Sequence, residues 1–410
     1  MTRRCRFCDA PVEQPFVDLG SMPLANAYLT REQLGRPEPS YPLRAFVCSR
    51  CWLVQADSFV PPEDIFSDYA YFSSYSDSWV AHARAFTGMA RARFDLGPGS
   101  QVIEVASNDG YLLRHFVAAG IPVLGIEPAA NVAEAARALG VPTETRFFGR
   151  AAADDLVARG LAADLVVGNN VLAHVPHIND FVGGLAAVLK PDGVVSVEFP
   201  HLLRLIEGVQ FDTIYHEHFY YLSLLAVERV FAAHGLRVFD VEEWPTHGGS
   251  LRVLACRSAS QRYPASPGVA KVRADEAAAG LDRIAPYAAF QATVAPIRTG
   301  LRAFLADAAG QGKTVAAYGA AAKGNTLLNF CGVGTAEIDY VVDRSPAKQG
   351  HFLPGSHLPI HAPDRLAQTR PDFVLILPWN IREEVMASMA HIADWGGYFV
   401  VAVPELTVLS

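Results

Sequence analysis

Seven consecutive residues, Tyr215 to Tyr221, concentrate side chains that can move protons. The segment reads Tyr-His-Glu-His-Phe-Tyr-Tyr and so brings imidazoles, a carboxylate and phenols close together. Either imidazole is a candidate general base, because histidine titrates near neutral pH. The alternative is an aromatic strand in which the imidazoles are incidental, since a short motif is a hypothesis until its structural context is known.

Four of the six cysteines form two close pairs near the start of the chain, Cys5 with Cys8 and Cys48 with Cys51. Two such pairs supply four thiolates, which is the ligand set of a tetrahedral structural zinc site. Four protein ligands leave no open position, so the metal is expected to support folding and to take no part in chemistry. Two disulfides or unpaired buried thiols are the alternatives, and a reducing compartment disfavours the disulfides.

The elements that position these residues begin with an apolar run, Val102 to Val105, which leads into a small polar loop and a helix expected near Tyr111. This strand-loop-helix pattern is typical of a doubly wound α/β sheet, where ligands lie beyond the carboxyl ends of the strands. Ala106 and Asn108 replace two glycines of the dinucleotide fingerprint, so the loop does not favour a pyrophosphate.

Polar side chains mark the ends of two further predicted strands. Glu127 follows the apolar run 122–126, roughly 20 residues after the loop, where a carboxylate can hydrogen-bond a ribose diol. A stabilising carboxylate at a helix N-terminus is the alternative for this residue. Asn169 and Asn170 end the run 164–170, where an amide can meet a carboxylate, an amine or an adenine edge. The next apolar run, 193–199, predicts another parallel strand.

The last third of the chain repeats the α/β pattern after an alanine-rich helical stretch at residues 264–312. A strand from Val315 ends in the small-residue loop Gly319 to Asn325, and a helix follows. Free amides at a helix N-terminus favour anionic oxygen, so Lys323 is predicted to contact a phosphate, with a solvent-facing lysine as the alternative. Further strands are expected at residues 338–342, 373–377 and 398–401.

Composition limits the possible partners. The chain has 410 residues, of which 51% are hydrophobic and 19% charged, as expected for two or three globular domains. Its formal net charge of -8 argues against nucleic acid. The N-terminal residues lack the apolar stretch of a secretory signal, and no apolar run approaches the ~18 residues of a membrane span. We therefore expect a cytoplasmic protein without a membrane or nucleic-acid partner.

Together these motifs resemble the sugar C-methyltransferases that act on nucleotide-linked deoxysugars. The resemblance covers nearly the whole chain and rests on six motifs that occur in the same order. The motifs are the four cysteines, Tyr69–Ser76, Glu104–Gly110, Tyr215–His218, His247–Arg252 and Gly319–Thr326.

The resemblance implies an α/β fold in three parts. Residues 1–75 are expected to form a zinc-binding domain, and residues 76–260 a class I S-adenosylmethionine methyltransferase core, which is doubly wound and Rossmann-like. Residues 261–410 are expected to form a helical linker and a second, smaller Rossmann-like domain that binds a nucleotide sugar.

The resemblance also implies S-adenosylmethionine as the methyl donor beside a structural zinc ion. Glu104 and Gly110 would shape its methionine pocket, and Glu127 would hold its ribose. The family usually has glycine where Ala106 stands, which places an extra methyl group near the methionine moiety. The expected donor-binding residues are Glu104, Ala106, Asn108, Gly110, Glu127, Asn169 and Asn170, and the expected substrate-binding residues are Tyr69, His247, Lys323 and Asn325.

The reaction implied is methylation of a ring carbon, expected to be C-3', next to the C-4' ketone of a nucleotide diphosphate deoxysugar, with dTDP as the expected nucleotide. His218 is predicted to be the base, and Glu217 to orient an imidazole or contact the sugar. Tyr215 and Tyr71 are predicted to hydrogen-bond the carbonyl oxygen or the sugar hydroxyls. His216 would point away if the segment is extended, because neighbours in a strand alternate faces.

Other functions fit parts of the pattern. A methyltransferase acting on oxygen or nitrogen would use the same donor domain, but it would not need a ketone. A non-catalytic, zinc-stabilised protein that binds nucleotide sugars is the alternative outside enzymology. A tight turn is the alternative for the residues around His247, and a core ion pair is the alternative for Arg252.

Overall fold

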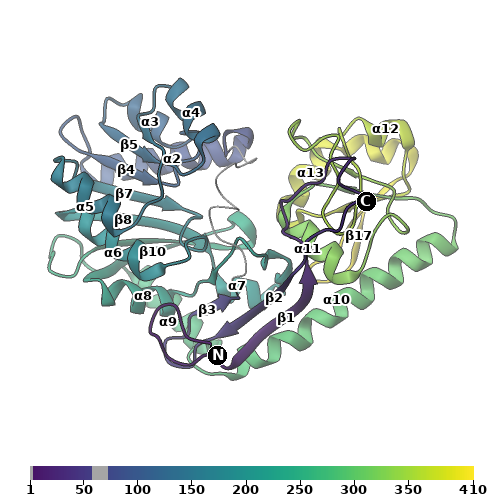
Figure 1. The fold of residues 1–410 in the computed structure, drawn as a ribbon, viewed down its shortest axis with the longest axis horizontal. Helices are drawn as coiled ribbons and strands as arrows, with labels where there is room; N and C mark the ends of the chain where they lie inside the picture. The colour runs from purple at the N-terminus through teal and green to yellow at the C-terminus, as the bar shows by residue number, and fades with distance from the viewer. Residues whose placement is uncertain (1–2, 58–72) are drawn as a thin grey trace.

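The computed structural model describes residues 3–57 and 73–410, which form three β-sheets. Figure 1 shows two lobes, with strands β1 (Gln14–Met22) and β2 (Tyr41–Val47) and the long helix α10 (Ala285–Gly310) beneath them. Among the described residues, no helix combines the length and apolar character that crossing a bilayer requires.

The N-terminal sheet joins the cysteine module to the proton-transfer segment. Its strands follow the order β1-β2-β3-β9, and all neighbours are antiparallel. Strand β3 (Val54–Ala56) comes directly after the second cysteine pair, whereas β9 (Tyr220–Tyr221) is the end of the segment rich in histidine and tyrosine. Val54 lies opposite Tyr221, so the module and the segment share one hydrogen-bonded ladder.

The middle sheet has the predicted doubly wound form. Its order is β10-β11-β8-β7-β4-β5-β6, in which the strands from β8 to β6 are parallel and the hairpin β10/β11 is antiparallel. The order reverses between β4 and β7, so their carboxyl ends open a crevice where ligands bind in such sheets. The strands are β4 (Val102–Val105), β5 (Val123–Ile126), β6 (Thr143–Glu144), β7 (Ala163–Asn169), β8 (Leu189–Pro200), β10 (Leu236–Trp244) and β11 (Ser250–Arg257).

Helices flank this sheet, and the first of them delivers an aromatic ring to the crevice. Helix α2 (Asp77–Phe94) begins after Ser76, whose hydroxyl accepts a hydrogen bond from the Trp79 amide at 3.3 Å. This is the usual N-cap arrangement, and it fixes Trp79 in the first turn. The other helices are α3 (Leu113–Val117), α4 (Ala130–Ala138), α5 (Arg150–Ala158), α6 (Ile178–Val188), α7 (Leu202–Glu207) and α8 (Leu224–Ala233).

The C-terminal sheet is also doubly wound, with the order β14-β13-β12-β15-β16-β17 and only β17 antiparallel. The strand predicted at residues 338–342 is shorter than expected, because only β13 (Val341–Val342) pairs with its neighbours. The remaining elements are β12 (Val315–Tyr318), β14 (Ile360–His361), β15 (Phe373–Ile376), β16 (Tyr398–Val401), β17 (Thr407–Leu409), α11 (Ala322–Cys331), α12 (Arg365–Thr369) and α13 (Arg382–Ser388).

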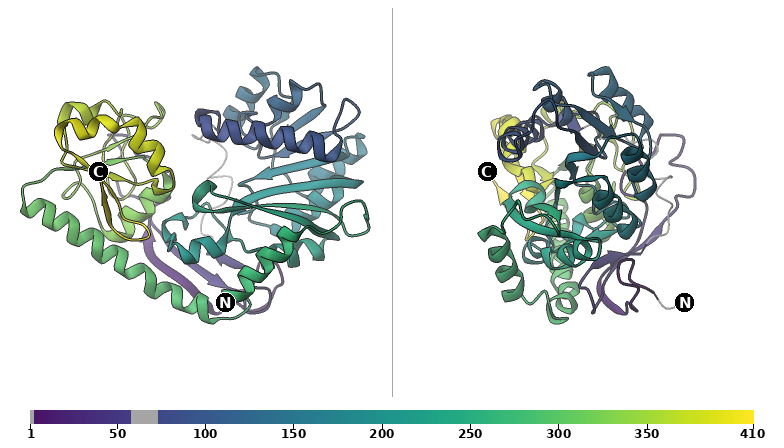
Figure 2. Two further views of the ribbon diagram at one scale, coloured as in Figure 1. Left: turned by 180° about the vertical axis from the view of Figure 1, so that it is seen from behind. Right: turned by 90° about the vertical axis from the view of Figure 1, so that its left-hand side faces the viewer.

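The predicted helical stretch contains α9 (Pro267–Ala278) and α10. Figure 2 shows α10 extending from beneath the middle lobe to the C-terminal lobe. At ~1.5 Å per residue, its 26 residues span ~39 Å. One apolar stripe of α10 packs on β1, where the ring of Phe290 stacks on Phe16 with the ring centroids 4.5 Å apart. The boundaries expected at residues 75 and 260 stay a prediction.

Candidate active site

A cavity of about 710 Å³ receives side chains from all three predicted parts of the chain. Its volume falls in the range of roughly 300–1,000 Å³ that is typical of ligand sites. The N-terminal module contributes the segment from Leu24 to Tyr28, and the C-terminal sheet contributes residues 321–323 and Lys348. The predicted site residues that line the cavity are Ala106, Asn108, Glu127, Asn169, Asn170, Tyr215, Glu217, His218, His247 and Lys323.

Three predicted residues do not line this cavity. Glu104 lies in β4, where burial raises the pKa of its carboxyl well above the usual range. Gly110 packs closely against Val141, and a Cβ at this position would lie only 3.0 Å from Val141 Cγ2. Asn325 is buried and its amide donates to the Ala25 carbonyl at 3.2 Å. The predicted residues Tyr69 and Tyr71 lie outside the described part of the chain.

The loop after β4 bends through left-handed conformations. Ala106, Asn108 and Gly110 have φ values of 52°, 49° and 77°. Glycine and asparagine tolerate this region, whereas an alanine there is strained by roughly 1–2 kcal/mol. The alternating bends expose the loop at the carboxyl end of β4. They also account for the glycine that the family resemblance implies at the position of Ala106.

Glu127 lies where the helix-terminus alternative expects it, and its role in holding a ribose stays a prediction. Its Oε2 accepts a hydrogen bond from the Asn108 amide and its Oε1 one from the Ala129 amide, each at 2.9 Å. Ala129 is the N-cap of α4, so the carboxylate does lie at a helix N-terminus. Each oxygen keeps a further lone pair, and the residue lines the cavity, where a diol can still reach it.

The residues at the switch point fit S-adenosylmethionine. Neither Nδ2 nor Oδ1 of Asn169 has a hydrogen-bond partner among the described residues, although the side chain is buried. A buried amide without partners is costly, so it is suited to a polar ligand with both donors and acceptors, such as the amino acid end of the donor. Phe147, Phe148 and Phe181 line the same cavity and offer apolar surface to an adenine ring.

The proton-transfer segment forms a turn and not the extended strand on which the His216 prediction depended. The His218 amide donates to the Tyr215 carbonyl at 2.9 Å, which closes a four-residue turn. The turn directs both side chains to one side, with ring centroids 4.0 Å apart. His216 does face elsewhere, because its Nε2 hydrogen-bonds the Tyr41 carbonyl at 3.2 Å.

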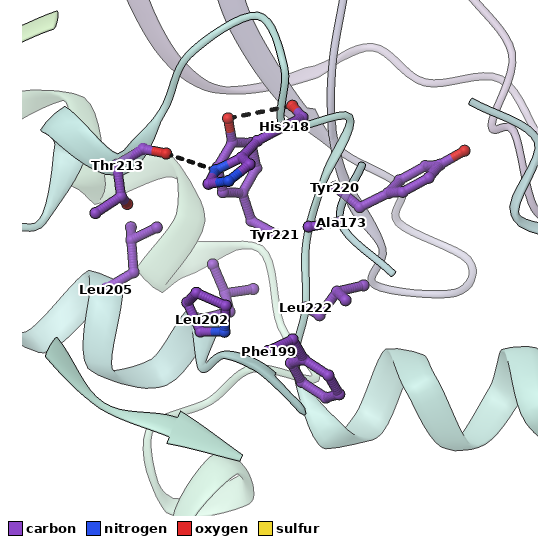
Figure 3. Close-up of a pocket in the computed structure, with 10 residues that line it drawn as sticks. Ala173, Phe199, Leu202, Leu205, Thr213, His218, Tyr220, Tyr221 and Leu222 are labelled. Carbon is purple, nitrogen blue, oxygen red and sulfur yellow. Dashed lines mark hydrogen bonds between the residues drawn. The ribbon is translucent and has the colours of Figure 1, made fainter. Parts of the chain in front are cut away.

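His218 is held in one tautomer. Its Nδ1 donates to the Thr213 carbonyl at 2.8 Å, as Figure 3 shows, and a carbonyl oxygen can only accept. The neutral ring therefore carries its lone pair on Nε2, which no described residue hydrogen-bonds. Apolar residues such as Leu205 and Phe199 line a small pocket together with the ring and lie below it in Figure 3. Burial, helped by the neighbouring His174, lowers the pKa of His218 well below its ordinary value, so the ring is neutral at working pH.

Glu217 reaches the cavity as a buried carboxyl with one strong partner. Asn26 Nδ2 donates to its Oε1 at 2.7 Å, and burial raises the pKa of Glu217 to about 7 despite this hydrogen bond. Asn26 lies between the two cysteine pairs and in turn accepts a hydrogen bond from the Tyr28 hydroxyl at 3.2 Å. The N-terminal module thus sets the position and the charge of a predicted catalytic group.

Replacing Asn26 with leucine is expected to shift the pH dependence of catalysis. Loss of the donor raises the pKa of Glu217 further, by about half a unit to one unit for one buried hydrogen bond. If catalysis uses the carboxylate, activity is lost as pH falls through this pKa. The acid limb of log kcat/KM, expected near pH 7, then moves to higher pH. The limb should disappear in Glu217→Gln, and a limb that stays near pH 7 in Asn26→Leu would contradict this role.

Sequence reasoning missed His174, although it follows the Asn169-Asn170 pair by only a few residues. Its Nδ1 donates to the Glu217 carbonyl at 3.0 Å, and its ring meets that of His218 edge-on with centroids 4.6 Å apart. Burial lowers the pKa of His174 to about 4, so it adds little positive charge beside the base. A histidine soon after a strand end was the available signal.

His247 adopts a left-handed conformation, with φ 55°, at the edge of the cavity. Its Nε2 accepts a hydrogen bond from Asn170 Nδ2 at 3.0 Å, which links the donor crevice to the loop before β11. Arg252 has the predicted structural role, because it pairs with the buried Glu198 at 3.1 Å and with Glu242 at 2.8 Å.

The four N-terminal cysteines have the geometry of a metal cage. Their sulfurs all lie within 4.8 Å of one another, with 3.5 Å between Cys5 and Cys51 and 3.6 Å between Cys8 and Cys48. Zn–S bonds of ~2.3 Å in a tetrahedron place sulfurs ~3.8 Å apart, so the cage fits zinc. The separations are far longer than a disulfide bond of ~2.05 Å, which excludes the disulfide alternative.

Comparison with protein families divides the chain into three matches. Residues 5–66 match a zinc binding domain, residues 79–241 a methyltransferase domain, and residues 245–404 a C-methyltransferase C-terminal domain. Together with the sheet order and the cysteine cage, these matches confirm the predicted fold class, the zinc module and the S-adenosylmethionine-binding core.

Comparison with individual proteins finds a relative that matches nearly the whole chain. The C-methyltransferase NovU of Streptomyces niveus is 37% identical over 406 residues, which cover 99% of this chain and 96% of NovU. A ubiquinone biosynthesis O-methyltransferase of Bartonella bacilliformis is 26% identical over 26% of this chain and 44% of its own length. Among solved structures, the magnesium protoporphyrin IX methyltransferase of Synechocystis PCC 6803 with bound SAH is 15% identical with a TM-score of 0.35, over 43% of this chain and 83% of its own.

Proposed function

This chain belongs to the C-methyltransferase family that includes NovU, and on that premise we propose that it methylates a ring carbon next to the ketone of a nucleotide diphosphate deoxysugar. Its dependence on S-adenosylmethionine follows from the methyltransferase core. The proposal adds the substrate class, the carbon expected to be C-3' beside a C-4' ketone, and the residues that act on them.

A carbon next to a ketone becomes a nucleophile only after it loses a proton. His218 Nε2 takes this proton, the C–H electron pair forms a C=C bond, and the carbonyl electrons move to the oxygen as an enolate. When bound, S-adenosylmethionine supplies an electrophilic methyl group to that carbon. The cavity holds the two partners together, which removes most of the entropic cost of their encounter.

The residues next to His218 support its role as the base. The Tyr215 ring packs at a tilt against the imidazole, with the ring centroids 4.0 Å apart, and Tyr215 lines the same cavity. We propose that its hydroxyl donates to the carbonyl oxygen or to a sugar hydroxyl. Glu217 and His247 line the same space and contact the sugar or tune the imidazoles.

One observation carries the proposal. The tautomer of His218, fixed by the Thr213 carbonyl, places a basic nitrogen in the same cavity as the residues of the donor crevice. A nucleotide-linked substrate is supported by the cavity's extension to Lys348 in the lobe of the second doubly wound sheet. We propose thymidine diphosphate as the nucleotide.

The test compares two substrates that differ at one position. Purified protein is supplied with S-adenosylmethionine and either a thymidine diphosphate 4-keto-deoxysugar or its 4-hydroxy counterpart. Methyl transfer to carbon is expected with the ketone alone, because the alcohol cannot form an enolate. In deuterated water, deuterium is expected at the carbon beside the ketone even without the methyl donor. Methylation of the 4-hydroxy sugar at a comparable rate would instead identify an O-methyltransferase.

A further inference from the structure

Lys323 enters the cavity from the C-terminal sheet, at the first turn of α11. Its Nζ donates to Asn380 Oδ1 at 2.6 Å and lies 4.8 Å from the centre of the Trp379 ring. The amide dipole of Asn380 and the ring quadrupole of Trp379 both attract the ammonium group, but neither side chain carries a negative charge that would neutralise it. The positive charge is therefore fixed in position but remains available to an anionic ligand.

A buried carboxylate stabilises this charge from one side. Asp212 has 0% exposure, and its Oδ2 accepts a hydrogen bond from Trp379 Nε1 at 2.7 Å. Burial raises the pKa of Asp212 to about 6, and attraction to the Lys323 ammonium opposes that rise. Lys323, Trp379 and Asp212 thus form one cluster, of which Lys323 lines the cavity.

This cluster lies next to the proposed base. Asp212 precedes Thr213, whose carbonyl fixes the His218 tautomer. On its other side, Trp379 packs so tightly on Gly248 that a Cβ there would lie 2.5 Å from the Trp379 ring. Gly248 follows His247 in the chain. The Trp379 indole therefore contacts the loop that carries His247 on one side and Asp212, shortly before the turn that carries His218, on the other. The lysine also lowers the pKa of both His218 and His247, although less than burial does.

We propose that Lys323 is a catalytic residue whose ammonium stabilises the enolate oxygen formed from the substrate's ketone. The inference rests on the proposed function and replaces the diphosphate contact that sequence alone predicts for this lysine. His218 becomes an imidazolium at the carbon from which it takes the proton, so the negative charge that forms on the oxygen needs a partner of its own. Preorganised cations and donors at such an oxygen are among the largest contributions to catalysis. When the carbon is methylated, the electron pair leaves the oxygen, the ketone re-forms and the lysine is unchanged.

Two measurements separate this role from diphosphate binding. Lys323→Gln removes the charge, and Lys313→Gln is the matched control, because Lys313 lies in the same lobe, two residues before β12, but bonds Asp372 at the surface. The first measurement is the rate of deuterium incorporation into the 4-keto sugar at saturation, without methyl donor. The second is the Kd of thymidine diphosphate alone, by calorimetry, which also reports whether the variant is folded.

Lys323→Gln is expected to lower the exchange rate by about 100-fold, as for loss of one oxyanion donor, and to change the Kd less than about threefold. Lys323→Arg is expected to stay within about tenfold of wild type, because it keeps the charge. A Kd raised tenfold or more with normal exchange would overturn the inference in favour of a phosphate contact. Equal exchange rates in the glutamine and arginine variants would overturn it as well. Absence of exchange in the wild-type protein would refute the proposed function itself, which is a separate outcome.

Discussion

Replacing His218 with asparagine is expected to lower the turnover of the 4-keto sugar by about a thousandfold, within the roughly 10²–10⁴ that a general base contributes. Asparagine keeps a donor that can reach the Thr213 carbonyl, so the turn should persist, but its amide cannot accept a proton at working pH. Deuterium exchange should fall by the same factor as methyl transfer, because both need the enolate.

The neighbouring His216 offers a matched control. It is also buried and also bonded to a backbone carbonyl, that of Tyr41, but it does not line the cavity. His216→Asn should change turnover less than about threefold. Near-normal exchange in His218→Asn would remove His218 as the base. The pH profile adds a sign test. The lowered pKa of His218 keeps the base neutral below pH 6.5, so His218 adds no acid limb near pH 7, where the limb expected from Glu217 lies.

Removing the metal is the second large expected effect, although zinc contacts no substrate in this proposal. The segment from Leu24 to Tyr28, which holds Asn26 against Glu217, lies between the two cysteine pairs. Structural zinc in small modules contributes an apparent 10–16 kcal/mol to folding, so the metal-free module should open and release Asn26. Chelation or Cys8→Ser is expected to abolish turnover and to lower the unfolding temperature.

Elemental analysis beside the activity assay checks this expectation, with one zinc ion per chain in the wild-type protein. Cys256→Ala is the control, because Cys256 is buried in β11, far along the chain from the cage, and should leave the metal content unchanged. Full turnover in protein stripped of metal would show that the module folds without it.

Local pattern was enough to predict the framework of the site. The run Val102 to Val105 is β4 as expected, and the polar ends of β5 and β7 do bring Glu127, Asn169 and Asn170 to one cavity. The reason is that the carboxyl ends of parallel strands meet at one edge of the sheet. Residues that follow different strands in the sequence therefore come close together in the structure. The zinc site was also predictable, because two close cysteine pairs supply the four thiolates that tetrahedral zinc requires.

Residues that meet through tertiary packing were not predictable. Asn26 and Tyr28 carry no motif of their own, and they reach Glu217 and the Ala320 carbonyl only because the N-terminal module packs against both lobes. Lys323 and Asn325 were both expected at the substrate, but residues two apart on a helix point about 200° apart. Only Lys323 lines the cavity, and Asn325 holds Ala25 instead.

The long helix α10 has a practical consequence for recombination within the family. It spans ~39 Å towards the C-terminal lobe and so fixes where Lys323 and Lys348 re-enter the cavity. In a chimaera that takes all residues after this helix from a relative, the residues around the sugar substrate would change, whereas those of the methyl-donor crevice would stay the same. The junction must preserve the helix length, because one added turn would displace the imported lysines by ~5.4 Å.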